Sequence, residues 1–143
     1  MKNILFSIGQ WVWGILQTIL GLFGFVFILI FSDKRKIRYY KGVLITVWAG
    51  KRFFSGVSLG FFVLLHEKSM IRQSYDSIFI CPEEETINHE YGHCIQSIML
   101  GPLYLFIVGI KSLINYWTCK NTKVYYTLFP EKWADKLGGV NRV

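Results

Sequence analysis

The chain has 143 residues, which is the length of one domain, and 52% of them are hydrophobic, more than in an average soluble protein. The formal net charge of +7 is high enough to consider a nucleic-acid partner. However, many of the basic residues directly follow a long apolar run, which is typical of a membrane boundary, so we expect no nucleic-acid partner. The three cysteines, Cys81, Cys94 and Cys119, form no C-x-x-C pair, which argues against a disulfide framework and against a cysteine-ligated zinc site.

A run without charged side chains extends from Ile4 to Phe31. It is longer than the about 20 apolar residues that cross a bilayer, and no cleavage site of a secretory signal follows it. We therefore predict a transmembrane helix over about Asn3 to Phe31. Small and amide side chains recur along it with a period of seven, at Gln10, Gly14, Gln17 and Gly21. This pattern predicts a helix face that packs against another membrane segment or against a second copy of the chain, as in a homo-oligomer.

Five basic residues follow this run closely: Lys34, Arg35, Lys36, Arg38 and Lys41. Basic residues next to a transmembrane helix are enriched on the cytoplasmic side, where they contact anionic lipid headgroups. We therefore predict that residues 1–41 are a membrane anchor with a basic cytoplasmic flank, in which Ser32–Lys41 is a polar connector. Residues 42–143 are predicted to form one compact domain on the cytoplasmic side, which makes this an α+β membrane protein.

Apolar residues continue from Gly42 to Glu67, but Lys51 and Arg52 in the middle of this stretch oppose a second transmembrane helix. Its β-branched and aromatic residues predict two strands of a short β-sheet, Val43–Ala49 and Val57–Leu65, with a turn region at Gly50–Gly56. The second strand is either a plain core strand or an edge strand that pairs with a peptide substrate. The candidate pairing residues are Ser58, Leu59, Gly60, Phe61 and Phe62.

A helix is predicted after the polar stretch Lys68–Asp76, which we expect to be a loop, and a short strand at Ser77–Cys81. The helix is expected to begin at Pro82, because proline suits a first helical turn and the three glutamates after it complement the positive end of the helix dipole. It should end near Leu100, because Gly101–Pro102 follows and proline cannot continue the hydrogen-bond ladder.

Within this helix, His89, Glu90 and His93 form the pattern H-E-x-x-H. The two histidines lie one turn apart on one helix face, so both imidazoles can bind a single Zn²⁺. Glu90 is rotated by about 100° from His89, which places its carboxylate beside the metal as a general base.

A second apolar segment, Leu103–Trp117, contains one lysine and is short for a membrane span. We predict a membrane-associated helix over about residues 102–118, which is re-entrant, interfacial or a span extended by its neighbours. Cys119–Lys123 is expected to be a polar turn.

The last predicted helix begins at Glu131, after Pro130, and ends at the glycine pair Gly138–Gly139. Glu131 and Asp135 lie four residues apart on one face of it. Catalytic zinc takes three protein ligands, and two histidines with one glutamate are a known set, so Glu131 is the candidate third ligand. Asp135 is the candidate acceptor for the second ring N–H of a ligating histidine, His89. The alternative is a surface helix whose acids pair with its own lysines.

The segments His89–His93 and Glu131–Asp135 together resemble the H-E-x-x-H and E-x-x-A-D motifs of the gluzincin metallopeptidases. They are most similar to the integral-membrane branch with the HtpX-type heat-shock proteases and the CAAX prenyl proteases, and the chain resembles a small bacterial member that is much shorter than these. In that family the glutamate of E-x-x-A-D is the third zinc ligand and the aspartate is its partner in the surrounding shell, which corresponds to Glu131 and Asp135.

The resemblance implies a membrane-anchored zinc metalloendopeptidase with one Zn²⁺ per chain, a peptide or protein substrate, and a location in the bacterial cell membrane with the catalytic domain on the cytoplasmic side. Glu90 would act as general base. A side chain that stabilises the oxyanion is normally also required, and Tyr125, Tyr126 and His66 have suitable chemistry. The alternatives are a non-catalytic membrane partner or regulatory protein that zinc stabilises, and a metal-free oligomeric membrane protein.

Overall fold

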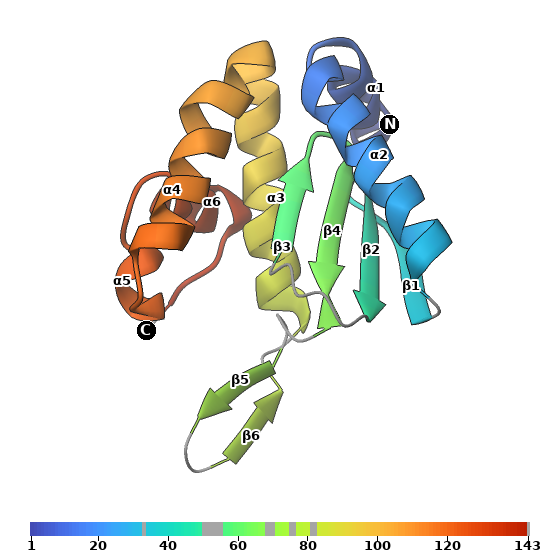
Figure 1. Ribbon diagram of the computed structural model, residues 1–143. Coiled ribbons are helices and arrows are strands. Elements are labelled where there is room, and N and C mark those ends of the chain that lie inside the picture. Colours follow the sequence, from blue (N-terminus) through green and yellow to red (C-terminus); the bar gives the residue numbers. More distant parts are fainter. Residues whose placement is uncertain (33, 50–55, 68–70, 75–76, 81–82, 143) are drawn as a thin grey trace.

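The computed structural model describes residues 1–32, 34–49, 56–67, 71–74, 77–80 and 83–142 (Figure 1). Its helices are α1 (Lys2–Val12), α2 (Ile15–Phe31), α3 (Glu83–Leu100), α4 (Ile110–Thr118), α5 (Thr122–Tyr125) and α6 (Glu131–Gly138), with the 3-10 helix η2 (Gly101–Leu103) and the π-helix η3 (Leu105–Gly109) between α3 and α4. Its strands are β1 (Lys34–Tyr40), β2 (Val43–Ala49), β3 (Gly56–Leu59), β4 (Phe62–His66), β5 (Ile71–Ser74) and β6 (Ser77–Ile80). The structure is therefore α+β.

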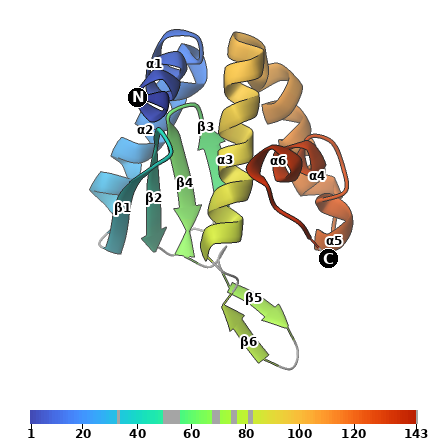
Figure 2. The same ribbon diagram turned by 180° about the vertical axis from the view of Figure 1, so that it is seen from behind.

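The main sheet is small and mixed, with the strand order β1-β2-β4-β3. β2 and β4 run parallel, whereas β1 is antiparallel to β2 and β3 is antiparallel to β4. Figures 1 and 2 show α2 on one face of this sheet and α3 on the opposite face. The strand β3 forms the sheet edge that lies beside α3. β5 and β6 form a separate antiparallel pair.

Alternating side chains of β2 and β4 supply the two halves of the core. Val43, Ile45, Val63 and Leu65 face α3, where they pack with Ile87 and Cys94. Trp48, Phe62 and Leu64 face α2, where they pack with Ile28. Because the two strands are buried on both faces, their sequences are apolar at nearly every position. The sheet thus fixes α3, which carries the H-E-x-x-H motif, against a rigid apolar surface.

The basic segment after α2, predicted to be a connector, is instead the strand β1. It pairs with β2 from Lys34 opposite Ala49 to Tyr40 opposite Val43. The two strands are joined by Lys41 and Gly42, which both have positive φ angles, of 46° and 95°. A two-residue hairpin turn of this kind matches the twist of the strands, and glycine adopts it readily. The exposed lysines and arginines of β1 therefore belong to a strand at the sheet edge.

The predicted strand Val43–Ala49 coincides with β2, but the predicted single strand Val57–Leu65 is wrong. It is a hairpin, because Gly60 has a φ angle of +62° and turns the chain between β3 and β4. Any side chain at Gly60 would collide with Thr18 of α2. The predicted turn at Gly50–Gly56 lies outside the described residues except for Gly56, which begins β3. Within the predicted loop Lys68–Asp76, the structure describes the strand β5.

The apolar N-terminal run is not one continuous helix. α1 and α2 are separated at Trp13 and Gly14 and are bent by 95° relative to each other. The residues of the predicted period-seven face contact the chain itself: Gln10 and Gln17 bond to α3 and to Gly101, and Gly21 lies against Leu59 and Phe62.

By length and composition, no single described helix suffices to cross a membrane, whereas two bent helix pairs pass the same test. The first is α1 with α2, and the second, bent by 117°, comprises residues 84–103 and 105–118. The two bends meet, because the main-chain oxygen of Gly101 accepts a hydrogen bond from Gln17 (3.1 Å) and a side chain at Gly101 would collide with Trp13. The membrane location of the chain stays a prediction from sequence.

Truncating Leu65 tests the role of the sheet in holding α3. Leu65 is fully buried between β4 and α3, so Leu65→Ala removes packing and leaves a cavity. We expect its free energy of unfolding to fall by about 2–5 kcal/mol. Ile37→Ala, at a position that is 46% exposed on β1, is the control and should change it by less than about 1 kcal/mol. Denaturant titration followed by circular dichroism measures both, and equal effects would contradict this description of the core.

Candidate metal centre

The helices α3 and α6 bring the two halves of the motif together. α3 extends from Glu83 to Leu100, as the proline, the glutamates and Gly101 predicted, although Pro82 itself lies outside the described residues. α6 begins at Glu131, directly after a cis Phe129–Pro130 bond, and ends at Gly139 with a φ angle of 75°. Both helices therefore have the bounds that their local sequence signals indicate.

Two glycines allow these helices to approach closely. A side chain at Gly92 would collide with the main-chain oxygen of Ala134 in α6, and a side chain at Gly138 would collide with that of Asn88 in α3. Gly92 occupies one of the two variable positions within H-E-x-x-H. The helix backbones thus meet beside both histidines, and the first turn of α6 lies opposite them.

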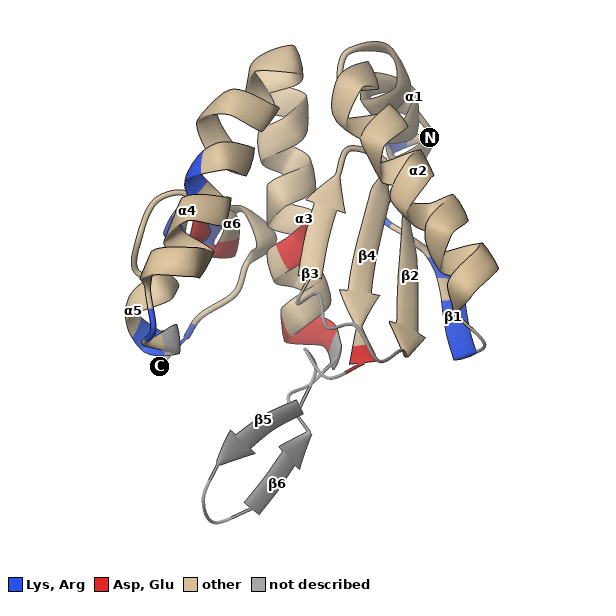
Figure 3. Cartoon of the chain, viewed as in Figure 1, with Lys and Arg blue, Asp and Glu red and all other residues tan. Residues whose placement is uncertain are grey.

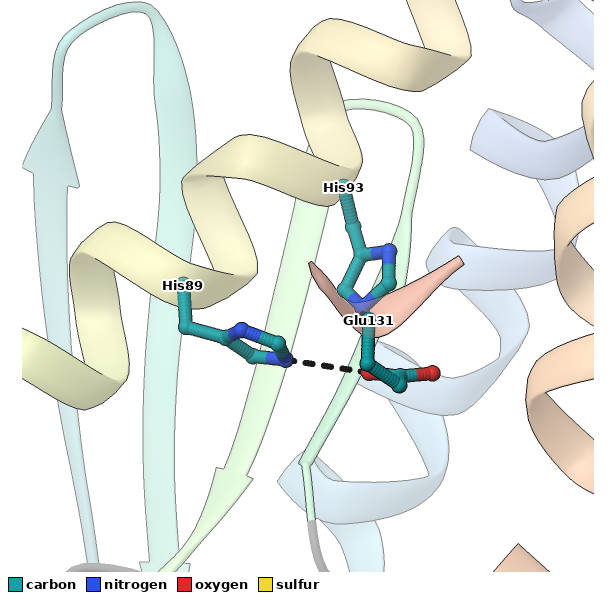
Figure 4. A group of neighbouring side chains, drawn as sticks. All are labelled: His89, His93 and Glu131. Atoms are coloured by element: carbon teal, nitrogen blue, oxygen red, sulfur yellow. Dashed lines mark hydrogen bonds and ion pairs between the residues drawn. The ribbon is translucent and has the colours of Figure 1, made fainter. Parts of the chain in front are cut away.

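His89, His93 and Glu131 form a buried cluster whose nitrogen and oxygen atoms converge. The Glu131 Oε2 atom lies 3.2 Å from His89 Nε2 and 3.1 Å from His93 Nε2, so both rings point at one carboxylate oxygen (Figure 4). One ligand atom from each residue lies within 4.8 Å of the others. Two imidazoles and a carboxylate at this spacing could hold a metal ion.

Each imidazole is also held at its second nitrogen. His89 Nδ1 lies 2.6 Å from Asp135 Oδ1, as predicted, and His93 Nδ1 lies 2.7 Å from Gln96 Oε1. Gln96 in turn donates to the main-chain oxygen of Pro130, which immediately precedes Glu131. Partners of this kind fix the ring orientation and leave Nε2 directed at the site.

Arg142 fixes the carboxylate that orients His89. Its guanidinium donates to both carboxylate oxygens of Asp135, at 2.7 and 3.1 Å, and stacks 3.5 Å from the centre of the Tyr126 ring. The Tyr126 ring packs edge-on against His89, with ring centres 5.2 Å apart. This arrangement links the residues after α6 to the first histidine through a two-point ion pair.

The second oxygen of Glu131 has its own donor. The Ser112 hydroxyl, from α4, donates to Glu131 Oε1 at 2.5 Å and lies 3.3 Å from the Tyr125 hydroxyl. α4 is further tied to the loop before α6 by Asn115, which donates to the main-chain oxygen of Phe129. The predicted membrane-associated segment therefore positions the third candidate ligand.

The electrostatics of the cluster favour an ionised Glu131 beside a protonated His89. Burial raises the pKa of Glu131, but its hydrogen bonds with His89 and His93 outweigh this and hold the pKa well below the usual range. Burial lowers the pKa of His89, yet its hydrogen bonds with Asp135 and Glu131 raise it to about 9. In the metal-free protein, protonated His89 thus stabilises the fold fully below its ordinary value of 6.5, and this contribution is lost as pH rises through about 9.

Glu90 lies beside the cluster and is held by the edge strand β3. The Ser58 hydroxyl donates to Glu90 Oε2 at 2.6 Å and lies 3.0 Å from the Glu90 main-chain oxygen. A Cβ atom at Gly56 would come within 2.5 Å of the other carboxylate oxygen, Oε1. Strand β3 therefore holds the Glu90 carboxylate in two ways: the Ser58 hydroxyl donates to one oxygen, and Gly56, which has no side chain, leaves space for the other.

These groups line one cavity of about 680 Å³ between β3 and α4. Glu90 and the three candidate ligands line it, and Leu113, Tyr116 and Trp117 line it from α4. A cavity of this size accommodates several side chains of a peptide, so a ligand in it would lie against the cluster.

The residues predicted to stabilise an oxyanion have different positions. Tyr125 and Tyr126 line the cavity. His66 does not: it is fully buried at the end of β4 and packs against Trp48 on the α2 face of the sheet. His66 is therefore outside the candidate site.

Only part of the predicted substrate-pairing strand lies at the cavity. Ser58 and Leu59 line it, whereas Gly60 and Phe61 form the hairpin turn and Phe62 is 3% exposed in the core. The turn places these three residues away from the edge. The Ser58 main-chain oxygen already accepts a hydrogen bond from Tyr104, at 3.0 Å.

Three contributions were absent from the sequence interpretation: Arg142, Ser112 and Gln96. No motif marks the first two, whereas Gln96 lies three residues after His93, a spacing that places both on one helix face.

Comparisons of the chain with family models, with curated proteins and with solved structures find no match.

Substituting Gly92 tests whether close approach of α3 and α6 assembles the cluster. Gly92→Ala would push α6 away from α3 and move Glu131 from the histidines, so we expect metal affinity to fall by at least about tenfold. Gly109→Ala is the matched control, because its Cβ atom would lie 3.8 Å from the nearest atom. Competition with a fluorescent chelator measures both affinities. Equal affinities in the two variants would show that the approach is not required.

The pKa of His89 predicts how metal binding depends on pH. A metal must displace the proton of His89, so the apparent affinity should rise about tenfold per unit as pH increases from about 6 to 8. Chelator competition over this range, with release of one proton followed in weak buffer, measures it. An affinity that does not change with pH would mean that His89 is not a ligand.

Proposed function

We propose that the protein is a zinc-dependent metallopeptidase that hydrolyses peptide bonds in a peptide or protein substrate. The observation that carries the proposal is the convergence of His89, His93 and Glu131 in the lining of a cavity that Glu90 also lines. Two imidazoles and one carboxylate are the ligands of a known class of catalytic zinc sites, which keep one position free for water.

The donor set fits zinc, and Glu90 favours hydrolysis. Two histidines and a carboxylate also bind iron(II) in oxygenases, so the ligands alone do not select the metal. An acid directly after the first histidine, with its carboxylate in the same cavity, is what metal-assisted hydrolysis requires as a proton acceptor. The resemblance to the gluzincin motifs, including the aspartate that here bonds to His89, points to the same reaction class.

When bound, the metal would polarise the substrate carbonyl and acidify a water molecule. The residues of the chain supply the remaining functions. Glu90 would take the proton of the attacking water and deliver it to the leaving amine. Ser58 would keep the carboxylate aimed at the cavity. Tyr125, whose hydroxyl lies 3.3 Å from that of Ser112, and Tyr126 are the candidates for stabilising the oxyanion.

Replacing Glu90 separates catalysis from metal binding. Glu90→Gln keeps the shape of the side chain but removes the base, so we expect cleavage of a peptide library to fall by at least about 100-fold. Zinc content, measured by elemental analysis, should stay at one equivalent per chain. Wild-type cleavage in Glu90→Gln would exclude this mechanism. A chain that binds zinc, is stabilised by it and cleaves no peptide would support the alternative of a non-catalytic zinc-stabilised partner or regulatory protein.

Two serines provide a matched pair of substitutions. Ser58→Ala removes the contact to Glu90, so we expect kcat to fall by roughly 10- to 100-fold with metal affinity unchanged. Ser112→Ala removes the contact to Glu131, so we expect metal affinity to fall by roughly 10- to 100-fold. At saturating zinc, Ser112→Ala should recover activity and Ser58→Ala should not. The reverse pattern would reject the roles given to these serines.

A further inference from the structure

Charged residues are absent from the two segments whose bends meet. Residues 3–31 and residues 91–110 contain no aspartate, glutamate, lysine or arginine. Figure 3 shows the consequence in space: the end of the molecule where the helix bends meet carries neither sign of charge, and the charged residues gather toward the opposite end. We call residues 9–20 and 97–107 the helical tip.

The surface of the helical tip is apolar on every element that forms it. Its exposed side chains belong to α1, α2, the end of α3, η2 and η3, and they are 40% to 72% exposed. They are Trp11, Val12, Trp13, Ile15, Leu16, Ile19, Leu20, Met99, Leu103, Phe106 and Ile107. An apolar surface of this extent is unusual for a protein surrounded by water and indicates contact with another phase or molecule.

The polar side chains of the helical tip are turned inward. Gln10, Gln17, Thr18 and Ser97 are all 0% exposed. Gln10 donates to the main-chain oxygen of Cys94 at 2.8 Å, Gln17 donates to Ser97 at 2.8 Å, and Ser97 donates to Gln10 at 2.9 Å. Thr18 donates to the main-chain oxygen of Gln10. The tip therefore has a polar interior and an apolar exterior, the reverse of a water-soluble helix pair.

This inverted arrangement fits lipid better than a protein partner. A partner protein covers one face, but the exposed apolar residues of the tip are spread over α1, α2, the end of α3, η2 and η3, for example at Val12, Ile19 and Phe106. Lipid surrounds a helix and favours polar groups that bond internally, as Gln10 and Ser97 do and as the Gln17 amide nitrogen does.

We propose that the helical tip inserts into the lipid of a single membrane leaflet. Each bent pair leads back from the tip to charged residues, Lys2 and Lys34 for α1 and α2, and Glu84 and Lys111 for α3 and α4. Both ends of each pair therefore remain on the same side of the bilayer. Leu113, Tyr116 and Trp117 of α4 extend the apolar surface to the cavity wall, so the cavity opens at the boundary between lipid and water. This inference does not depend on the proposed hydrolysis.

Fluorescent labels locate the tip in the bilayer. Single cysteines are introduced at Val12 and Phe106, which are 72% and 66% exposed, and at Lys136 as a control, in a chain whose own cysteines are replaced. The full chain is reconstituted into phosphatidylcholine vesicles. We expect brominated acyl chains to quench the first two labels and aqueous iodide to quench only the third. Iodide quenching of the tip labels would overturn the proposal, and so would protection from both quenchers accompanied by cross-linking of two chains, which indicates a second copy as the partner.

A double variant distinguishes insertion into one leaflet from crossing of the bilayer. Cysteines at Lys2 and Lys136 are exposed to a maleimide that cannot cross the membrane. If both positions lie on one side, each molecule in sealed vesicles carries two labels or none, whatever its orientation. A population dominated by single labels, which becomes doubly labelled only after the vesicles are lysed, would show that the chain crosses the bilayer and would reject the proposal.

Glutamates introduced at the helical tip test its affinity for lipid. The variant Val12→Glu with Phe106→Glu places acids in lipid, so we expect its partition into phosphatidylcholine vesicles to fall by at least about tenfold. The control, Ile37→Glu with Val124→Glu, adds the same charges at positions 46% exposed outside the tip and should bind as the wild type does. Circular dichroism checks that both variants are folded. Equal loss in both variants, or no loss in either, contradicts insertion of the tip.

Discussion

A buried carboxylate is the constraint on which the site depends. Glu131 is 1% exposed, and its charge is compensated by the two imidazoles and by the Ser112 hydroxyl. An uncompensated carboxylate in this place would be strongly destabilising, so the surrounding structure has to supply a cation. In the metal-free protein that cation is the proton on His89, and a metal ion would replace it. The site is thus assembled before a metal binds, which reduces the reorganisation that binding requires.

The fold meets this constraint by packing the sheet, α6 and the N-terminal helices against one helix, α3. α3 packs on the sheet through Ile87 and Cys94, contacts α6 through Gly92, and receives the N-terminal helices through Gln10. Its histidines face α6, while Glu90 faces the edge strand, where Ser58 holds it. A helix with so many partners is rigid, and rigid elements keep catalytic groups within the small tolerances that chemistry requires. The helical tip includes the end of the same helix, so the cavity and the apolar surface of the tip share one support.

Local patterns predicted the parts of the structure that depend on neighbouring residues. Helical spacing and end signals were sufficient for α3, for α6 and for placing His89 and His93 on one helix face, because each depends on residues within a few turns. Glu131 was proposed as their partner from the known ligand sets of zinc and from the motif resemblance, not from local spacing. Contacts between distant segments were not predictable in this way. Arg142 reaches Asp135 only because the chain after Gly139 turns back. An apolar run likewise cannot reveal that α1 and α2 separate at Gly14, which lies against the side-chain amides of Gln10 and Gln17. The basic strand β1 was missed because its charges outweighed its alternating pattern.

The proposed function depends on whether His89, His93 and Glu131 together bind one zinc ion. X-ray absorption at the zinc edge of the purified full chain measures this directly, with Glu131→Gln for comparison. We expect one zinc per chain with nitrogen and oxygen neighbours at about 2.0–2.1 Å, including scattering from two imidazoles, and a changed oxygen shell in the variant. A chain without zinc, a sulfur neighbour at about 2.3 Å, or a spectrum that Glu131→Gln leaves unaltered would contradict the account.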